Sequence, residues 1–376
     1  MRRQLRVSSL LLSAAIPFAT ADPIFGNDSF CGCYLTNGEE GHYFSYHRFF
    51  DFRNLPQYAG VPDVIQDARA SAEADPTSSF FSSRSWDDFW MINNWNNSWP
   101  NASRSDVSYL MVNSPNNVYI EANSDPESEP ATWLTLRTQR LRNFQTAAEI
   151  ETLSPNYKYV SVRMLARTRG GPGAVTALFT YRVAPTLSEV QESDLEVLTG
   201  DPLGLVRYTN QPSYTEDGDS VPNATKNVTL PRGLKWTDWA VHRLDWTPGM
   251  TTWYVDDVLV FQSTFQVPED ESAIILNAWS DGGEWSGNMT VGDAAWLQVQ
   301  WIEVVYNNTD HGKKTIGVKG KSCRRVCSVD ETPQLGTPVL LWESAAGGLR
   351  TQGMHLPWAL PIVVGFTMVL ISGGLL

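Results

Sequence analysis

The chain has 376 residues, a formal net charge of −13, and 42% hydrophobic and 18% charged residues. Its 15 Trp, 15 Phe and 13 Tyr exclude a disordered chain, because disordered chains are poor in aromatic residues and cannot bury a core. The acidic balance argues against a nucleic-acid-binding protein, which would present a basic surface to the phosphate backbone. The composition therefore predicts a folded protein whose tryptophans either pack a core or stack against a ligand.

The first 21 residues have the pattern of a secretory signal peptide. Three arginines precede an apolar run over residues 10–18, and Ala19-Thr20-Ala21 supplies the small residues of a cleavage site. Seven N-X-S/T sequons agree with passage through the secretory pathway. They begin at Asn27, Asn96, Asn101, Asn223, Asn227, Asn288 and Asn307. We therefore expect a secreted glycoprotein.

The four cysteines form two clusters, Cys31 with Cys33 near the mature N-terminus and Cys323 with Cys327 after the last predicted strand. In an oxidising compartment four cysteines indicate two disulfides, for which three pairings exist. Cys31 and Cys33 stand too close in sequence for an easy mutual bond. We therefore expect both bridges to join the two clusters.

Between the ends, short apolar or alternating runs are separated by Gly, Pro, Asn and Asp, which is typical of an all-β sandwich or barrel. A short helix is possible near residues 61–74, and Asp256-Asp257 has the position of a hairpin turn. The predicted strands cover residues 132–136, 157–166, 175–183, 187–198, 241–246, 252–255, 258–261, 273–279 and 297–306.

One predicted strand carries three acids at alternating positions. Residues 187–198 read LSEVQESDLEVL, so Glu192, Asp194 and Glu196 point to one face of the strand. A solvent-exposed strand face would explain such a pattern equally well. The α-carbons of Glu192 and Glu196 lie roughly 13 Å apart at about 3.3 Å per residue. Two inward-leaning Glu side chains can bring their carboxyl groups to the roughly 5 to 5.5 Å typical of retaining glycosidases.

The surroundings of these acids resemble glycoside hydrolase family 16, whose active-site strand carries E-x-D-x-E. Residues 242–249 read HRLDWTPG and residues 253–256 read WYVD. They are similar to the family's H-x-Y-x-x-D-W-T-P and W-Y-V-D-G, with Leu244 in place of an aromatic residue and Asp257 in place of the glycine. The resemblance covers about residues 44–306, and within the family the chain is most similar to secreted fungal proteins. It implies a concanavalin A-like β-jelly-roll sandwich of two curved antiparallel sheets.

The resemblance also implies a role for each acid: Glu192 is the nucleophile, Asp194 the assisting acid and Glu196 the acid/base. Sugar rings have apolar faces that stack on aromatic side chains, so a polysaccharide site needs such platforms. The candidate substrate-binding residues are Trp279, Trp285, Tyr208 and His242. We expect no cofactor and no metal.

The leading hypothesis is a retaining endo-β-glucanase that hydrolyses cell-wall β-1,3 or β-1,3/1,4-glucan by double displacement. One alternative is a cell-wall transglycosylase that passes the glucan chain to glucan or chitin instead of water. Another is a carbohydrate-binding wall protein whose acids are inactive. We expect the protein to be a monomer.

The C-terminal segment changes character after the predicted glycosidase domain of residues 22–309. Residues 310–344 are basic and contain two cysteines, which suggests contact with anionic wall polymer or lipid head groups, although a solvated tail is the simpler interpretation. Residues 356–376 carry no charge and follow small residues and a polar spacer. Residues 345–376 therefore predict a GPI-attachment signal at the cell surface, and a simple tail anchor is the alternative.

Overall fold

The structure is a computed structural model, and it describes residues 30–37, 41–98, 108–124, 129–309, 323–330 and 332–344. The predicted signal peptide of residues 1–21, residues 310–322 of the basic segment and the predicted GPI signal of residues 345–376 lie outside the described residues. Within the part of the chain that the structure describes, no helix is long and apolar enough to span a membrane.

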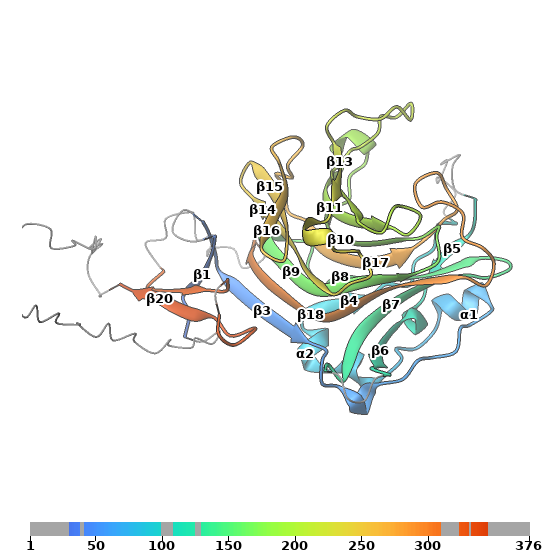
Figure 1. The fold of residues 1–376 in the computed structure, drawn as a ribbon, viewed down its shortest axis with the longest axis horizontal. Coiled ribbons are helices and arrows are strands. Elements are labelled where there is room, and N and C mark those ends of the chain that lie inside the picture. The colour runs from blue at the N-terminus through green and yellow to red at the C-terminus, as the bar shows by residue number, and fades with distance from the viewer. Residues whose placement is uncertain are drawn as a thin grey trace, which may run out of the picture.

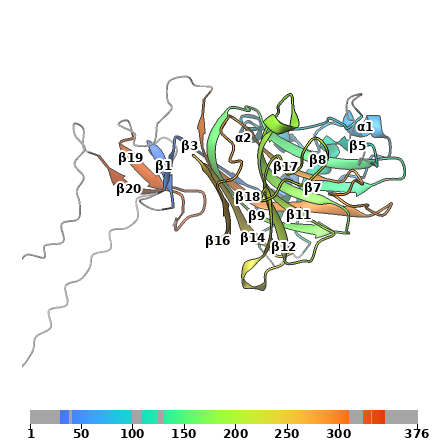
Figure 2. The ribbon, with the colours of Figure 1, turned by 90° about the horizontal axis from the view of Figure 1, so that it is seen from above.

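Most strands belong to two curved layers of largely antiparallel strands (Figures 1 and 2). The outer layer runs in the order β6 (Val118–Ala122), β7 (Thr132–Arg140), β18 (Ala294–Asn308), β9 (Tyr157–Gly170), β14 (Ala240–Thr247), β15 (Met250–Val255) and β16 (Val258–Ser263), and β3 (Tyr46–Asp51) also pairs with β18. The inner layer runs in the order β13 (Thr225–Thr229), β12 (Leu205–Asn210), β11 (Gln191–Leu198), β10 (Val175–Arg182), β17 (Ala273–Trp279) and β8 (Gln145–Thr152), with β4 (Trp90–Ile92) and β5 (Met111–Asn113) also on β8. A short pairing between β7 and β8 joins the two layers. The predicted all-β jelly-roll sandwich is confirmed.

The hydrophobic core lies between the layers, because alternate residues of each strand point inward. Leu195 of β11, Leu276 of β17 and Leu134 of β7 all belong to one buried cluster. Trp246 and Trp253 are also buried there, so these tryptophans serve the core. Each layer therefore keeps one face for the core and one for other contacts.

Helices are few and short among the described residues. The helix that we expected near residues 61–74 is only α1 (Ala68–Ala72), which begins where the Asp67 carboxylate accepts a hydrogen bond from the Ala70 N–H. The other short helices are α2 (Arg84–Asp87) and the 3-10 turns η2 (Pro56–Tyr58), η3 (Ser79–Ser82), η4 (Pro115–Asn117), η5 (Leu187–Glu189) and η6 (Pro231–Gly233).

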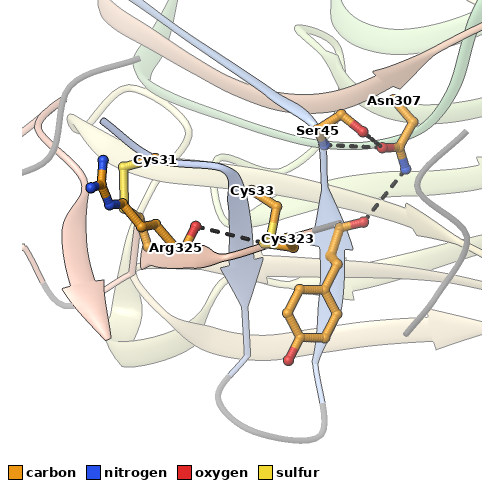
Figure 3. Close-up of a disulfide and its surroundings, with 8 residues drawn as sticks. Cys31, Cys33, Ser45, Asn307, Cys323 and Arg325 are labelled. Carbon is orange, nitrogen blue, oxygen red and sulfur yellow. Dashed lines mark hydrogen bonds between the residues drawn. A yellow bond between two sulfur atoms is a disulfide. The ribbon is translucent and has the colours of Figure 1, made fainter. Parts of the chain in front are cut away.

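A small second sheet lies beyond one end of the sandwich, next to β3 (Figures 1 and 2). Its strand order is β2 (His42–Phe44), β1 (Cys33–Thr36), β19 (Arg325–Ser328) and β20 (Val339–Glu343). Disulfides join Cys31 to Cys327 and Cys33 to Cys323, which confirms that the bridges connect the two clusters. Figure 3 shows the bridge between Cys33 and Cys323. The interpretation of residues 323–344 as a solvated tail is wrong, because this segment supplies two strands and its Val326 is fully buried.

Charged side chains connect the small sheet to the outer layer. Arg243 of β14 binds Asp245 at 2.7 Å and Asp330 at 3.2 Å, and Arg163 of β9 binds Asp330 at 2.8 Å. Asn37 donates to Asp245 at 3.0 Å. Because Asp330 follows β19 and Asn37 follows β1, this partly buried network holds the small sheet against the sandwich.

Candidate active site

Strand β11 presents its three acids on the face opposite the core. Leu195 and Val197 point into the core cluster, so Glu192, Asp194 and Glu196 point away from it. We call this side of the inner layer the open face. The predicted placement of the three acids on one face is therefore observed, whereas their catalytic roles stay predictions.

Asp194 lies between the two glutamates and is buried. Its Oδ2 accepts a hydrogen bond from the Gln211 amide at 3.1 Å, and its carboxyl group is hydrogen-bonded to Glu192. Burial, followed by the charges of Glu192 and Glu196, raises the pKa of Asp194 well above its ordinary value. Asp194 is thus suited to stay protonated and to donate its proton toward Glu192.

Glu196 is also buried, and it is held by a tryptophan. The indole Nε1–H of Trp285 donates to Glu196 Oε1 at 3.2 Å. Burial raises the pKa of Glu196 to about 7, although the Trp285 hydrogen bond and the positive charge of Arg207 act in the opposite direction. A carboxyl group with a pKa near 7 can both donate and accept a proton at neutral pH.

Arg207 supports this tryptophan from the neighbouring strand β12. Its guanidinium lies 4.6 Å from the centre of the Trp285 ring and makes two hydrogen bonds to Asp201, at 2.8 and 2.9 Å. Sequence reasoning missed both Arg207 and Asp201. The alternation of Leu205–Asn210 was the available signal, because it places Arg207 on the face opposite Val206 and Tyr208.

A straight row of side chains crosses the open face at the level of Glu196. Cross-strand partners share a face, and the register pairs each member of the row with the next. From β8 to β13 the row consists of Glu149, Asn277, Ala177, Glu196, Arg207 and Asn227. We call these six residues the open-face row. Ala177 leaves room beside Glu196, because its side chain is small.

The β8 end of the open-face row is polar and aromatic. Glu149 accepts hydrogen bonds from Asn93 at 2.8 Å and from the Trp95 indole at 2.7 Å, and it is also hydrogen-bonded to Asn277. Burial raises the pKa of Glu149. Trp95 remains 44% exposed. The alternation of acids in the segment T-A-A-E-I-E-T was the signal that would have placed Glu149 on this face.

Two of the predicted substrate-binding residues lie in the core. Tyr208 is fully buried against Trp253 and Phe261, with ring centres 5.5 and 6.5 Å away. His242 is buried between the layers, where desolvation lowers its pKa to about 4. The prediction that Tyr208 and His242 contact substrate is therefore wrong, because both point to the core side of their strands.

The two predicted tryptophans lie on the open face. Trp279 is two residues after Asn277 on β17 and therefore shares its face, and Trp285 contacts Glu196. Both side chains are half-buried. Their contact with substrate stays a prediction.

The core side of β11 carries a serine whose hydroxyl is satisfied. Ser193 Oγ donates to Asn210 Oδ1 at 2.7 Å and lies 3.2 Å from the Thr251 hydroxyl. The Asn210 amide in turn donates to the Phe265 carbonyl at 2.8 Å. These bonds hold β11 in register with β12 and hence fix the position of the acids.

Comparison with known families and proteins gives a consistent result. Residues 107–302 match the model of a family described as glycosyl hydrolases family 16. A beta-glucanase of Paenibacillus polymyxa is 25% identical over 154 residues, which cover 40% of this chain and 61% of the relative. A beta-glucanase of Bacillus licheniformis is 29% identical over 118 residues, which cover 31% of this chain and 45% of the relative. The chain thus spans about half to three fifths of the length of these curated relatives.

Solved structures are also similar to this chain. The Bacillus licheniformis beta-glucanase matches with a TM-score of 0.44 and 22% identity, over 58% of this chain and 92% of that chain. The laminarinase catalytic domain of Thermotoga maritima matches with a TM-score of 0.44 and 19% identity, over 59% of this chain and 92% of that chain.

Proposed function

The chain belongs to glycosyl hydrolases family 16, and we propose that it is a retaining endo-β-glucanase acting on β-1,3 or β-1,3/1,4-linked glucan. The observation that carries this proposal is the arrangement of Glu192, Asp194 and Glu196 on one face of β11, with Glu196 held by Trp285. The names of the curated relatives, all beta-glucanases, support the substrate class.

In the first step, a Glu192 carboxylate oxygen attacks the anomeric carbon while Glu196 gives its proton to the leaving glycosidic oxygen. The raised pKa of Glu196 supports this role, because a general acid must be protonated before it can donate. Asp194 donates a hydrogen bond to Glu192 and thereby orients the attacking carboxylate. The product is a glycosyl ester on Glu192.

In the second step, the charge of Glu192 has been lost in the ester, and Glu196 is ionised after giving up its proton. Ionised Glu196 then takes a proton from a water molecule, which attacks the anomeric carbon and releases Glu192. The Trp285 hydrogen bond and Arg207 stabilise this ionised form. The same carboxyl group thus serves as acid and then as base.

The experiment is incubation of the protein with laminarin, lichenan and labelled oligosaccharide acceptors, followed by sizing of the products. A hydrolase gives only products shorter than the donor, with the β configuration retained at the new reducing end. Products longer than the donor, on glucan or chitin acceptors, would instead support a transglycosylase. Carbohydrate binding without any change in product size would contradict both enzyme proposals and leave a binding protein.

We further propose that the protein is secreted and held at the fungal cell surface or wall by a GPI anchor. Two disulfides support passage through an oxidising compartment. The side chains of the sequon residues Asn223, Asn227 and Asn288 are exposed, as N-glycosylation in the secretory pathway requires. Treatment of intact cells with phosphatidylinositol-specific phospholipase tests the anchor. Release of the protein is expected, and retention after treatment would contradict the proposal.

A further inference from the structure

Asn227 lies at the edge of the inner layer and points to the open face. Its neighbour Val228 packs against the core, so Asn227 points the other way. Its cross-strand partner is Arg207, which is in turn the partner of Glu196. The Thr209 and Thr225 hydroxyls, 3.0 Å apart in the adjacent row, show that side chains of β12 and β13 meet on this face.

The position of Asn227 relative to Glu196 follows from strand spacing. Neighbouring strands lie about 4.8 Å apart, so the α-carbons of Asn227 and Glu196 are separated by roughly 10 Å across β12. Asn227-Val228-Thr229 is a sequon, and the side chains of Asn227 and Thr229 are both exposed. An acceptor for N-glycosylation therefore stands two strands from Glu196, at one end of the open-face row.

We propose that Asn227 carries an N-linked glycan that stands on the open face beyond Arg207 and limits the length of carbohydrate bound along the open-face row. The inference rests on the proposed glucanase function and on secretion. In the modification, the Asn227 amide nitrogen loses a proton and displaces the lipid pyrophosphate from the anomeric carbon of a lipid-linked oligosaccharide donor. The new bond joins the amide nitrogen to the first sugar of the glycan.

The two ends of the open-face row then differ in the space that they leave for a bound sugar chain. At the β8 end, Asn93, Trp95 and Glu149 present hydrogen-bonding groups and an exposed indole to a sugar chain. At the β13 end, the glycan occupies the space that further sugar units would need. A bound glucan therefore extends from Glu196 toward β8 and stops near Arg207 on the other side.

Occupancy of Asn227 is tested first, on protein secreted from a eukaryotic host. Enzymatic removal of the glycans leaves Asp in place of each glycosylated Asn, and mass spectrometry of the digested protein reports the change. Trypsin cuts after Lys226 and Arg232, so Asn227 and Asn223 fall on separate peptides. We expect Asp at position 227, and unmodified Asn there would overturn the proposal.

The effect on carbohydrate length is tested with variants of the sequon. Thr229→Val and Asn227→Gln both prevent glycosylation at Asn227, whereas Thr229→Ser preserves the sequon. Thr309→Val is the matched control, because it removes the sequon at Asn307, which lies by the small sheet and binds Ser45 (Figure 3). We expect kcat/KM for laminarin to rise at least threefold in Thr229→Val and Asn227→Gln only.

Binding of laminaritriose and laminarihexaose by calorimetry gives a second measurement. The affinity gained from triose to hexaose should be larger in Thr229→Val than in the wild type and Thr229→Ser. Equal gains in all forms would overturn the limiting role of the glycan. If no form cleaves or binds these sugars, the glucanase proposal and the limiting role both fail, whereas the peptide masses alone decide whether Asn227 is modified.

Discussion

Glu192 and Glu196 have separate duties in the proposed reaction, although both face the same side of β11. We expect Glu192→Gln and Glu196→Gln each to lower kcat on laminarin at least about 100-fold, because the first removes the nucleophile and the second the proton donor. Circular dichroism and thermal unfolding of both variants should match the wild type. A variant with near-normal turnover would refute the role given to that residue.

The choice of leaving group separates the nucleophile role of Glu192 from the proton-donor role of Glu196. A nitrophenyl glycoside releases a weakly basic phenolate, which needs no proton from Glu196. The rate at which Glu196→Gln forms the glycosyl ester from this substrate should therefore approach that of the wild type. Glu192→Gln should stay inactive on the same substrate.

Arg207 should tune the proton donor, because its positive charge stabilises ionised Glu196 and lowers the pKa of this residue. Replacement by Met removes the charge, so the pKa of Glu196 should rise above about 7. The general acid then stays protonated to higher pH, and the alkaline limb of kcat/KM against pH should move upward. The measurement is the pH–rate profile on laminarin oligosaccharides.

Arg182 offers a matched control for this experiment. It lies at the end of β10 and pairs with Asp270 at 3.6 Å. Arg182→Met should therefore leave the alkaline limb unchanged. An equal shift in both variants, or a downward shift in Arg207→Met, would contradict the assignment.

The sequence correctly predicted that the three acids share one face of β11, but it did not predict all their neighbours, and the reason is the direction of individual side chains. Tyr208 lies one residue away from the open-face register of β12, and His242 lies on β14 of the outer layer and points to the core. Because strand side chains alternate, such a one-residue difference moves a side chain from one face to the other. Arg207 was missed because β12 was not predicted as a strand, so its alternation of faces was not considered.

At the scale of the elements, the hairpin between β15 and β16 contains two adjacent aspartates whose replacement by glycine should have opposite effects on stability. Asp256 and Asp257 both have positive φ, 46° and 62°. Asp256 also accepts the Val241 N–H at 2.8 Å, whereas Asp257 is exposed. We expect Asp257→Gly to stabilise the protein by about 0.5–1 kcal/mol and Asp256→Gly to destabilise it, because only the second loses a hydrogen bond.

Urea unfolding of the two single variants measures both effects. Each variant relieves the left-handed backbone at one position, so the difference between them isolates the Asp256 hydrogen bond. Equal stabilisation by both glycines would show that this bond contributes nothing.

Strands could be predicted where apolar and polar residues alternate in their own sequence. They could not be predicted where pairing with a neighbouring strand determines the structure. The predicted ranges 132–136, 157–166 and 273–279 all fall within or match observed strands. Strands β13 and β19 were missed. Their sequences TKNVT and RVCS are short and show no sustained alternation of apolar and polar residues, and they become strands because they pair with β12 and β1.

For the whole molecule, the open face and the small sheet are independent sites. The small sheet contacts the outer layer through Arg163, Arg243 and Asp330, whereas the acids of β11 lie on the far side of the inner layer. The core between the layers separates the two. Changes in the small sheet should therefore alter stability and leave the chemistry of the acids intact.

The two disulfides provide the test of this separation. The bridges join positions 296 and 290 residues apart. When one bridge is intact, the other closes a ring of only about eight residues, worth about 2–3 kcal/mol in the chain-entropy estimate. When neither is present, the long loop is released as well, which costs roughly a further 6 kcal/mol.

We therefore expect Cys33→Ala/Cys323→Ala and Cys31→Ala/Cys327→Ala each to lower the free energy of unfolding by about 2–3 kcal/mol, and the fourfold variant to lose more than the sum of the two. Urea unfolding measures this, and kcat on laminarin at 25 °C should be unchanged in both paired variants. Additive losses would contradict the shared long loop. A large fall in kcat with intact folding would contradict the independence of the open face from the small sheet.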